Sequence, residues 1–512
     1  EKPSMESRAQ AYSHNEEEAT PGYYKVSLLS KTGTNNETTT DGSKIVAEMT
    51  TTTRTGLHRY TFPKAGTASV VMDLNYTYHG TDIRNAVMNV STTAEGNTAI
   101  SGRFSARNVS GHGKYTMYFY METDTPTTAI NTWNGKNFGT DTKLTGNDLG
   151  AVLSFNVEAN QQIKVKVGIS PISEKQAKID MDAEASSWDF NQIKEAAHNE
   201  WNEMLGKIDI TTSDISDPDG TLTKQFYTCL YRLFTTPVNA TSTSGTYRGT
   251  DGKVYEANGY THYDSWTLWD DYRKYPIIGL ICPDIYKDLI QSIADMIVTG
   301  ISTWGNETQP VLTVRNEHAV ALLADGIEKG YTDIKNLEQA YEAAKQIANN
   351  SVTSTVESQG YFSGRVDKTV EYAYDDWALS IIADELGKTD ESEYYLNRSF
   401  NYKNLYKEDA VTYSDGTKGG LLWPKDSSGN WMNADPEQYG NNGLYQGTLW
   451  QYTWYDSNDV SGLMTLFGGK EKMLSALNTL YGAKGSEADG KRMLHTNTNE
   501  IDLQTPYLFN YA

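Results

Sequence analysis

Two short segments of this chain place carboxylates beside tryptophan rings. Residues 265–273 contain Trp269, Asp270 and Arg273, and a spacing of three would put the last two on one face of a helix. An acid and an arginine on one face can bind adjacent hydroxyl groups of a ligand through charged hydrogen bonds. Acidic residues at a helix start also favour the helix dipole, so the spacing leaves a purely structural role open.

A second acidic pair, Glu371 and Asp375, is four residues apart and should project from one helix face. Like charges in this position repel unless something binds them, which favours a binding site over an ordinary surface. Asp376 follows directly. Two further polar segments, 446–454 and 499–504, are bordered by aromatic residues, and each alone is weak evidence.

The composition favours a carbohydrate site. The chain has 35 Tyr and 11 Trp among 512 residues, many of them beside Asp, Glu and Asn. A sugar offers C–H faces that stack on aromatic rings and hydroxyl groups that bind charged or amide side chains. Aromatic loops also occur in ordinary packing, so the composition does not identify the ligand.

Other classes of function lack their features. The formal charge of −22 argues against a nucleic-acid partner or an anionic membrane surface, and no apolar run approaches the roughly 18 residues needed to span a bilayer. Zinc-binding, Walker and serine-hydrolase motifs are absent. His318 is expected to be a hydrogen-bonded packing residue, and Cys229 and Cys282 are predicted to be buried core residues without a disulfide.

The elements that must position these residues fall into two domains, as a chain of this length predicts. Short β-branched or aromatic runs, separated by clusters of Gly, Asn, Asp and Thr, are typical of an antiparallel β-sandwich. We expect its strands at residues 23–29, 45–53, 58–62, 68–75, 115–122 and 163–169.

Helix formers follow from about Ser173. Apolar residues three and four apart predict helices at 174–185 and 189–205, with a capping signal at 186–190. The predicted domains are a β-sandwich at 1–172, a helical linker at 173–208 and a toroid of paired helices at 209–512. Helices of the toroid are expected at 222–235, 269–281, 283–299, 316–329, 337–347, 372–386, 392–405, 458–467 and 470–481.

These segments together resemble glycoside hydrolase family 92, the calcium-dependent, inverting exo-α-mannosidases of bacteria. The similarity runs from residues 13–24 to 507–511, and its most specific phrase is Glu-Tyr-Ala-Tyr-Asp-Asp-Trp at 371–377. The resemblance implies a β-sandwich followed by an (α/α)6 barrel, a mannose-containing glycan as substrate and Ca²⁺ as cofactor. It also implies a secreted, periplasmic or cell-surface location, and it leaves the oligomeric state unknown.

The resemblance further implies that the chain is a fragment. It begins on Glu1 without an initiator methionine and stops at Ala512. The family's catalytic base comes from an acidic segment downstream of the phrase at 507–511, and the family's sandwich begins earlier. We therefore expect both domains to be truncated and the barrel to be incomplete at its C-terminal end.

One departure from the family pattern falls on Gln446. The family's phrase around its general acid is Glu-Gly-Asn-Ala-Trp-Gln-Tyr, whereas residues 446–452 read Gln-Gly-Thr-Leu-Trp-Gln-Tyr. An amide thus replaces the general acid. A second departure lies at 499–504, which reads Asn-Glu-Ile-Asp-Leu-Gln where mannose-cleaving members resemble Asn/His-Glu-Pro-Ser-His-His. Both changes fall where the leaving group would sit.

A change of leaving group explains both departures. Loss of the acid should slow the expulsion of an alkoxide by about 10²–10⁴, whereas a phosphate with a pKa of about 6 leaves without help. Mannosyl-phosphate-cleaving members of the family lack the acid glutamate, so the resemblance favours mannose-α-1-phosphate diesters of mannan-type glycans. Two alternatives stay open: an ordinary α-1,2-type mannosidase that uses another acid, such as Asp502, and a mannan-binding protein without turnover.

The resemblance also assigns most of the remaining candidate residues. Gln451 is a candidate metal ligand. Lys491, Arg492 and His495 are candidate phosphate donors by their position a few residues before Glu500 and not by the resemblance, although a solvated basic loop explains them as well. The mannose would be bound by Trp269, Asp270, Arg273, Glu371, Asp375, Asp376, Asn499 and Glu500.

Overall fold

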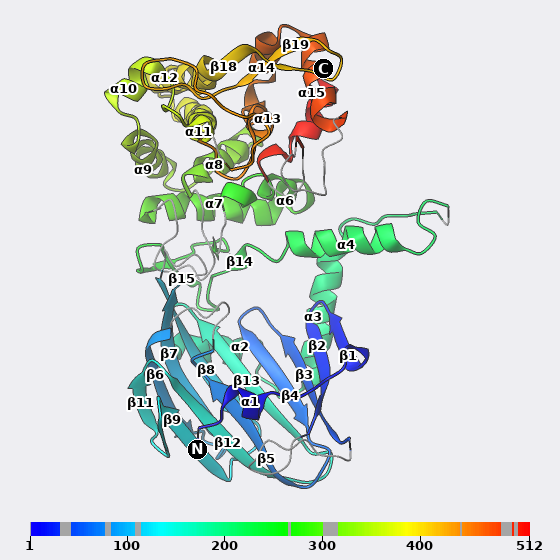
Figure 1. Ribbon diagram of the computed structural model, residues 1–512. Helices are drawn as coiled ribbons and strands as arrows, with labels where there is room; N and C mark the ends of the chain where they lie inside the picture. Colours follow the sequence, from blue (N-terminus) through cyan, green and yellow to red (C-terminus); the bar gives the residue numbers. More distant parts are fainter. Residues whose placement is uncertain are drawn as a thin grey trace. The chain divides into compact units, whose positions relative to one another are not determined.

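The computed structural model describes residues 2–30, 42–76, 83–107, 114–213, 215–264, 268–300, 316–440, 443–482, 494–495 and 500–512. The described chain forms two compact units, which are coloured blue to green and green to red in Figure 1. The first unit contains the described residues up to 264, and the second contains those from 268 onward.

A larger and a smaller sheet form the sandwich of the first unit, and in both of them every pairing of neighbouring strands is antiparallel. The larger sheet has the order β1 (Glu17–Thr20), β2 (Tyr23–Leu29), β3 (Lys44–Thr51), β4 (Thr55–Thr61), β13 (Gln162–Ser170), β8 (Lys114–Thr123), β7 (Thr98–Arg107), β6 (Ile83–Thr92) and β11 (Lys143–Gly146). The smaller has the order β10 (Asn137–Gly139), β9 (Ala129–Asn134), β12 (Leu149–Val157) and β5 (Gly66–Asp73).

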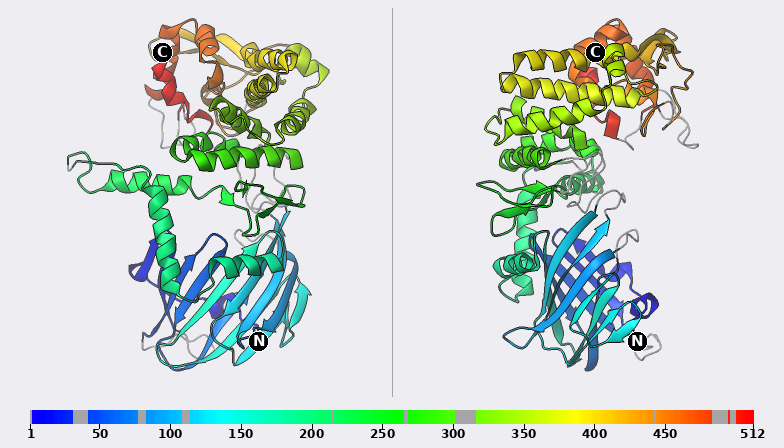
Figure 2. Two further views of the ribbon diagram at one scale, coloured as in Figure 1. Left: turned by 180° about the vertical axis from the view of Figure 1, so that it is seen from behind. Right: turned by 90° about the vertical axis from the view of Figure 1, so that its left-hand side faces the viewer.

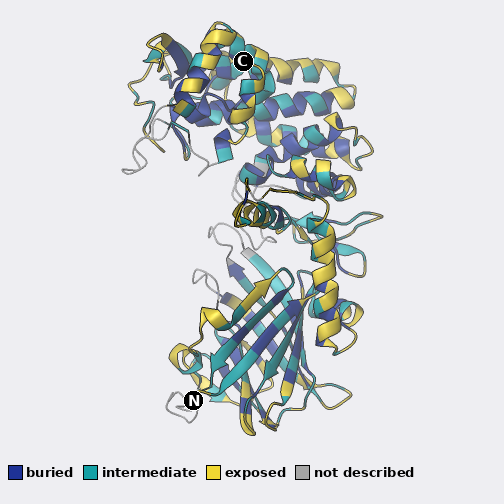
Figure 3. Ribbon diagram, turned by 90° about the vertical axis from the view of Figure 1, so that its right-hand side faces the viewer, coloured by how far each residue is buried: buried dark blue, intermediate teal, exposed yellow. Residues whose placement is uncertain are grey.

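Alternating side chains explain how the two sheets pack into a sandwich. Along β12, Leu149, Ala151, Leu153, Phe155 and Val157 are buried, which is the period of two expected of a strand with one face in a core. They share one hydrophobic cluster with apolar residues of β5 to β8 and β13. Buried and more exposed positions alternate along the strands in Figure 3. The apolar surface removed from water holds the sheets together.

Two helices cover part of the larger sheet. Gly168 in β13 permits the close approach of α2 (Glu174–Glu184), because an added Cβ would lie 2.5 Å from the carbonyl oxygen of Ala177. Asp189 caps α3 (Phe190–Leu205) by accepting from the N–H groups of Asn191 and Gln192 at 3.0 and 3.1 Å, which confirms the predicted capping signal. The unit also contains α1 (Met5–Arg8), η1 (His14–Glu16), α4 (Thr221–Leu233), and the strand pairs β14 (Val238–Asn239) with β17 (Tyr263–Asp264) and β15 (Thr246–Arg248) with β16 (Val254–Glu256).

The second unit is mainly helical, and Figure 2 shows its helices from two further sides. Its elements in chain order are α5 (Leu268–Asp271), α6 (Tyr275–Ile281), α7 (Pro283–Thr299), η3 (Asn316–His318), α8 (Ala319–Glu328), α9 (Leu337–Asn350), α10 (Ser354–Gln359), α11 (Val366–Glu385), α12 (Thr389–Ser399), η4 (Phe400–Leu405), β18 (Tyr406–Thr412), β19 (Lys418–Leu422), α13 (Leu449–Tyr452), η5 (Ser457–Asp459), α14 (Val460–Phe467), α15 (Lys470–Gly482), η6 (Glu500–Asp502) and η7 (Thr505–Asn510).

The predicted β-sandwich followed by a helical domain is confirmed. The helices of the described residues do not close into a ring, and the toroid that we expected was one incomplete at its C-terminal end. The predicted continuous helix at 269–281 is wrong: α5 ends at Asp271 and α6 begins at Tyr275, with Pro276 in its first turn. Proline lacks the N–H that a continuous helix would need there. The predicted domain boundaries stay predictions.

The two cysteines have different surroundings, and neither forms a disulfide. Cys282 is buried, as predicted. Cys229 is exposed on α4, so its prediction as a core residue is wrong; Leu230 is the buried residue of that helix. Among the helices of the described residues, none is long and apolar enough to cross a membrane.

Candidate active site

Trp269 brings three separate segments of the second unit together. It lies in α5, and its indole Nε1–H donates to Oε1 of Glu371 in α11 at 3.1 Å. Both side chains are buried. The ring of Tyr445 meets Trp269 edge-on, with ring centroids 5.3 Å apart. The residue that precedes Gln446 therefore belongs to the same cluster as the first two predicted segments.

Arg273 is held by backbone and aromatic contacts. It does not share a helix face with Asp270, because α5 ends before Arg273. Its Nη1 donates to the carbonyl oxygen of Trp269 at 2.9 Å. The guanidinium lies over the rings of Tyr272 and Tyr455, 4.3 and 5.0 Å from their centroids, in favourable cation–π contacts. Nη2 is buried and has no hydrogen-bond acceptor among the described residues.

Asp375 contacts a different partner from Glu371. Its Oδ1 lies 2.7 Å from Nδ1 of His318, which is fully buried, and this confirms the hydrogen-bonded packing role expected of the histidine. The His318 ring in turn packs against Tyr272, with centroids 5.2 Å apart. Both acids on this face of α11 thus lead to the segment around α5. Glu371 accepts from the Trp269 indole, whereas Asp375 contacts His318, which packs against Tyr272.

Asp270 and Glu500 form a carboxyl pair between α5 and η6. Burial raises the pKa of Asp270 to about 7, assisted by the charges of Glu500 and Asp271 and by a hydrogen bond with Glu500, whereas Arg273 acts in the opposite direction. A negative charge beside a buried carboxyl opposes the ionisation of that carboxyl, which is why Glu500 adds to the effect of burial on Asp270. The predicted sugar ligands Asp270 and Glu500, 230 residues apart, thus lie in one site.

Gln446 stands in an unusual backbone conformation at the edge of this cluster. Its φ is +49°, in the left-handed region that non-glycine residues seldom occupy, and its side chain is exposed. Nε2 donates to the hydroxyl of Tyr445 at 3.3 Å. Gly447 follows, and an added Cβ there would lie 2.5 Å from Cδ1 of Ile501. The turn is therefore packed against η6, next to the carboxyl pair.

Gln451 is fixed by the capping box at the start of α13. Its backbone N–H donates to the hydroxyl of Thr448 at 3.2 Å, and its Oε1 accepts from the Thr448 N–H at 3.1 Å. Its Nε2 donates to Oδ2 of Asp502 at 3.1 Å. The same carboxylate oxygen lies 3.0 Å from Nδ1 of His495. The amide of the predicted metal ligand is thus engaged at both its atoms.

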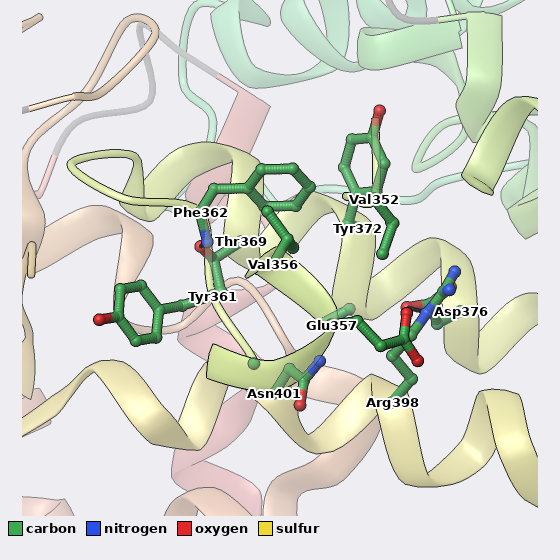
Figure 4. A pocket seen from close by; sticks show the side chains of 12 residues that line it. Val352, Val356, Glu357, Tyr361, Phe362, Thr369, Tyr372, Asp376, Arg398 and Asn401 are labelled. Carbon is green, nitrogen blue, oxygen red and sulfur yellow. Dashed lines mark hydrogen bonds and ion pairs between the residues drawn. The ribbon is translucent and has the colours of Figure 1, made fainter. Parts of the chain in front are cut away.

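Asp376 points to a different part of the unit from Asp375. Its two oxygens accept from Nε and Nη2 of Arg398 in α12, at 2.7 and 2.5 Å, and both side chains are buried. Figure 4 shows this pair beside Glu357 at one end of a pocket, with the rings of Phe362 and Tyr372 at the other. The carboxylate joins two helices, and its predicted part in sugar binding stays a prediction without support from these contacts.

Three other candidates, Lys491, Arg492 and Asn499, lie outside the described residues. The described candidates lie on or just after α5, on α11, in the turn before α13 and in α13 itself, on η6, and at His495. Sequence reasoning missed Tyr272, Tyr445 and Tyr455, which pack directly on Trp269 and Arg273. The signal was present in the richness of aromatic residues, but composition does not say which rings meet which charged groups.

Calcium binds six to eight oxygen ligands. The carboxyl pair of Asp270 and Glu500 supplies oxygens of this kind, and the Gln451 carbonyl keeps a second lone pair beyond its bond to Thr448. In the part of the chain that the structure describes, no group of three or more His, Cys, Asp or Glu side chains is placed to hold a metal ion. The donors suit Ca²⁺ in type, but the described side chains do not form a complete site.

Two models of protein families cover almost the whole chain. The N-terminal domain of glycosyl hydrolase family 92 matches residues 1–170, and the catalytic domain of that family matches residues 176–512. The chain belongs to glycosyl hydrolase family 92. The resemblance inferred from the sequence is confirmed at the level of the family.

Solved structures and a curated protein resemble the chain over nearly all its length. The structure of the family 92 glycosyl hydrolase ccman5 has 40% identity and a TM-score of 0.92, and the match covers 99% of this chain and 67% of that one. The family 92 α-mannosidase BT3965 of Bacteroides thetaiotaomicron has 27% identity and a TM-score of 0.79, over 98% and 66%; it has also been solved with mannoimidazole. An uncharacterized secreted glycosidase of Arthroderma benhamiae is 24% identical over 99% of this chain and 65% of its own length. The chain thus spans about two thirds of the length of these relatives.

Proposed function

We propose that this family 92 member is an exo-acting, inverting glycoside hydrolase that releases α-linked mannose, and that its substrates are mannose-α-1-phosphate diesters of mannan-type glycans. The observation that carries the phosphate part is Gln446, an amide in the turn where the family pattern has its general acid. The mannose part is supported by the family, by the related α-mannosidase BT3965 and by the joining of α5, α11 and η6 in one site.

The amide at Gln446 suits a phosphate and not an alkoxide. A neutral amide can donate a hydrogen bond, but it cannot transfer a proton to a departing oxygen near neutral pH. A sugar alkoxide needs that proton, because its conjugate acid resembles water with a pKa of about 16. A phosphate with a second pKa of about 6 carries its negative charge without it. An amide also avoids placing a carboxylate against the phosphate.

Asp502 is poorly suited to replace the missing acid. Its side chain is fully buried, and one oxygen accepts from Gln451 and lies 3.0 Å from His495. A general acid must lie within hydrogen-bond reach of the oxygen that it protonates, whereas Asp502 is fully buried and its Oδ2 is engaged by Gln451. These contacts weigh against an ordinary α-mannosidase that relies on this residue. A mannan-binding protein without turnover is the remaining alternative.

In this proposal Asp270, Arg273 and Glu371 bind the mannose, and Ca²⁺ is the cofactor. When bound, the ion would hold ring hydroxyls and favour distortion of the sugar toward an oxocarbenium-like transition state. The base that activates water is not assigned to a described residue. We also propose a secreted, periplasmic or cell-surface location, supported by the secreted glycosidase among the relatives.

The decisive experiment compares two substrates in the enzyme at its full natural length. One is a mannose-α-1-phosphate diester and the other is α-1,2-mannobiose, with mannose release measured for both. The proposal expects a kcat/KM for the phosphodiester that exceeds that for mannobiose. Faster cleavage of mannobiose would overturn the phosphate assignment, and mannose binding without turnover of either substrate would favour a binding protein.

A further inference from the structure

A row of buried rings passes Arg273 in the second unit. Tyr452 and Tyr455 stack with centroids 5.9 Å apart and planes inclined by 8°. The Arg273 guanidinium lies over Tyr455 and also over Tyr272, and Tyr272 in turn meets His318. The three tyrosines and the histidine are all buried. The row therefore forms a packed wall along one side of the arginine.

Hydrogen bonds hold both ends of this row. At one end Asp375 fixes His318 at 2.7 Å. At the other end the hydroxyl of Tyr452 donates to the carbonyl oxygen of Tyr445, the residue before Gln446. The row thus connects the turn that carries the family's altered acid position with the acidic face of α11. A packed row with fixed ends restricts the motion of the groups that it contacts.

The middle of the row restrains Arg273 through neutral groups. The hydroxyl of Tyr272 donates to that of Tyr455 at 3.2 Å, which joins the two rings under the guanidinium. Burial raises the pKa of both phenols well above the usual range, so both rings stay uncharged. One end of the guanidinium is engaged by the Trp269 carbonyl, while Nη2 is buried without an acceptor among the described residues. A buried N–H of this kind is unfavourable unless a ligand supplies an oxygen.

We propose that Tyr272 and Tyr455 are positioning residues that hold Arg273 so that its Nη2 donates to an oxygen of the mannosyl substrate. This inference rests on the proposed function and names two residues that no sequence motif singled out. A donor that is already fixed loses little freedom when the sugar binds. The contact is made in the ground state as well as in the transition state, so its loss should raise KM with little change in kcat.

A double-mutant cycle in the full-length enzyme tests the two residues. Tyr455→Leu removes the ring under the guanidinium, and Arg273→Lys keeps the charge but removes the planar fork. We expect each single variant to weaken mannose binding, measured by calorimetry, by about tenfold. The double variant should bind no more weakly than Arg273→Lys, because Tyr455 acts through Arg273. Tyr455→Phe keeps the ring and should restore most of the affinity.

Tyr402→Leu is the matched control. Tyr402 is another fully buried tyrosine of this unit, and its hydroxyl donates to Asp459 at 2.9 Å. This variant should lower the melting temperature and leave the Kd for mannose unchanged. If Tyr455→Leu does not fold, Tyr272→Leu, which removes the other ring in contact with the guanidinium, takes its place in the cycle.

Two outcomes separate this inference from the proposed function. If Tyr455→Leu weakens binding by the same factor with and without Arg273→Lys, the positioning role is overturned while the proposed function stands. If the unaltered enzyme neither binds mannose nor releases it, the proposed function is contradicted. A rise in KM at nearly constant kcat for the single variants supports the inference, whereas a fall in kcat alone would overturn it.

Discussion

The indole N–H of Trp269 donates to Glu371 across 102 residues of sequence, at 3.1 Å between two buried side chains. An indole can only donate, so this contact fixes the direction of one carboxyl oxygen of Glu371. It also ties the short helix α5 to the long helix α11. The orientation of the Glu371 carboxyl, and with it the predicted sugar binding, therefore depends on Trp269 in α5.

Replacing Trp269 by Phe keeps an aromatic ring and removes the donor. A hydrogen bond to a charged group contributes about 1.5–3 kcal/mol, so the affinity for mannose should fall by about 10–100-fold. Calorimetric titration of the full-length enzyme measures this change. Trp133→Phe is the matched control, since buried Trp133 of the β-sandwich donates to Asp148 at 3.1 Å. If the unaltered enzyme, Trp269→Phe and Trp133→Phe all bind mannose with equal affinity, the Trp269–Glu371 contact has no role in sugar binding.

Gln446→Glu should create mannosidase activity. A general acid contributes about 10²–10⁴ in rate, so cleavage of α-1,2-mannobiose is expected to rise by that factor, while cleavage of the phosphodiester falls. Gln446 is exposed, so the exchange disturbs no core packing. Gln446→Asn keeps an amide and a residue that tolerates positive φ, and it should gain nothing. A glutamate variant without any gain on mannobiose would show that the site lacks more than a proton donor.

The buried pair of Asp376 and Arg398 should matter for stability. Arg398→Met leaves a buried carboxylate without its partner, so the free energy of unfolding should fall by about 3–5 kcal/mol. Lys178 and Asp182 form an exposed pair at 2.6 Å and provide the control. Lys178→Met should change the free energy by less than about 1 kcal/mol. Urea denaturation compares the two variants, and similar small losses for both would contradict the prediction.

The first unit should lose stability in acid. Burial lowers the pKa of His262 to about 3, whereas an unfolded histidine titrates near pH 6.5. Between these values the unfolded state binds a proton that the native state does not, so the free energy of unfolding falls as the pH drops below about 6.5. At pH 5 the loss is about 2 kcal/mol. The His262→Gln variant lacks this histidine, so its stability should fall less between pH 7 and 5. If calorimetry shows that the melting temperature falls equally over this range in the variant and in the unaltered protein, the prediction is wrong.

Removal of calcium should abolish turnover. The oxygen donors of Asp270 and Glu500 suit Ca²⁺, whereas Mg²⁺ demands a smaller octahedral set. We expect EDTA to stop mannose release by the full-length enzyme, and added Ca²⁺ to restore it more fully than Mg²⁺ does. Turnover that continues unchanged after chelation and dialysis would count against the calcium assignment.

The fold was predictable where the signals are local. Helix α7 runs from Pro283 to Thr299 as predicted, because a proline at its start and Gly300 after its end mark it in the sequence. The carboxylate of Asp189 caps α3 as predicted. Strands β6, β7 and β9 to β12 were missed, since many of their residues are Thr, Ser, Asn or Gly. Their conformation depends on pairing with neighbouring strands, which propensity alone does not reveal.

The site was predictable in its residues more than in its contacts. Spacing placed Glu371 and Asp375 on one face of α11, and the structure agrees. Spacing could not predict that the next residue, Asp376, turns to Arg398 instead. Nor could it predict that Asp270 would lie against Glu500. Such partners are decided by which helices pack together, and that information is spread over the whole chain.

The exposed turn at Gln446 has a consequence for evolution. The codons for glutamine and glutamate differ in their first base, and no core side chain needs to move when one replaces the other. Under the proposed function, one mutation adds or removes the general acid at this turn and keeps the mannose site intact. The presence of a proton donor in such a site is then a trait that selection can reverse quickly.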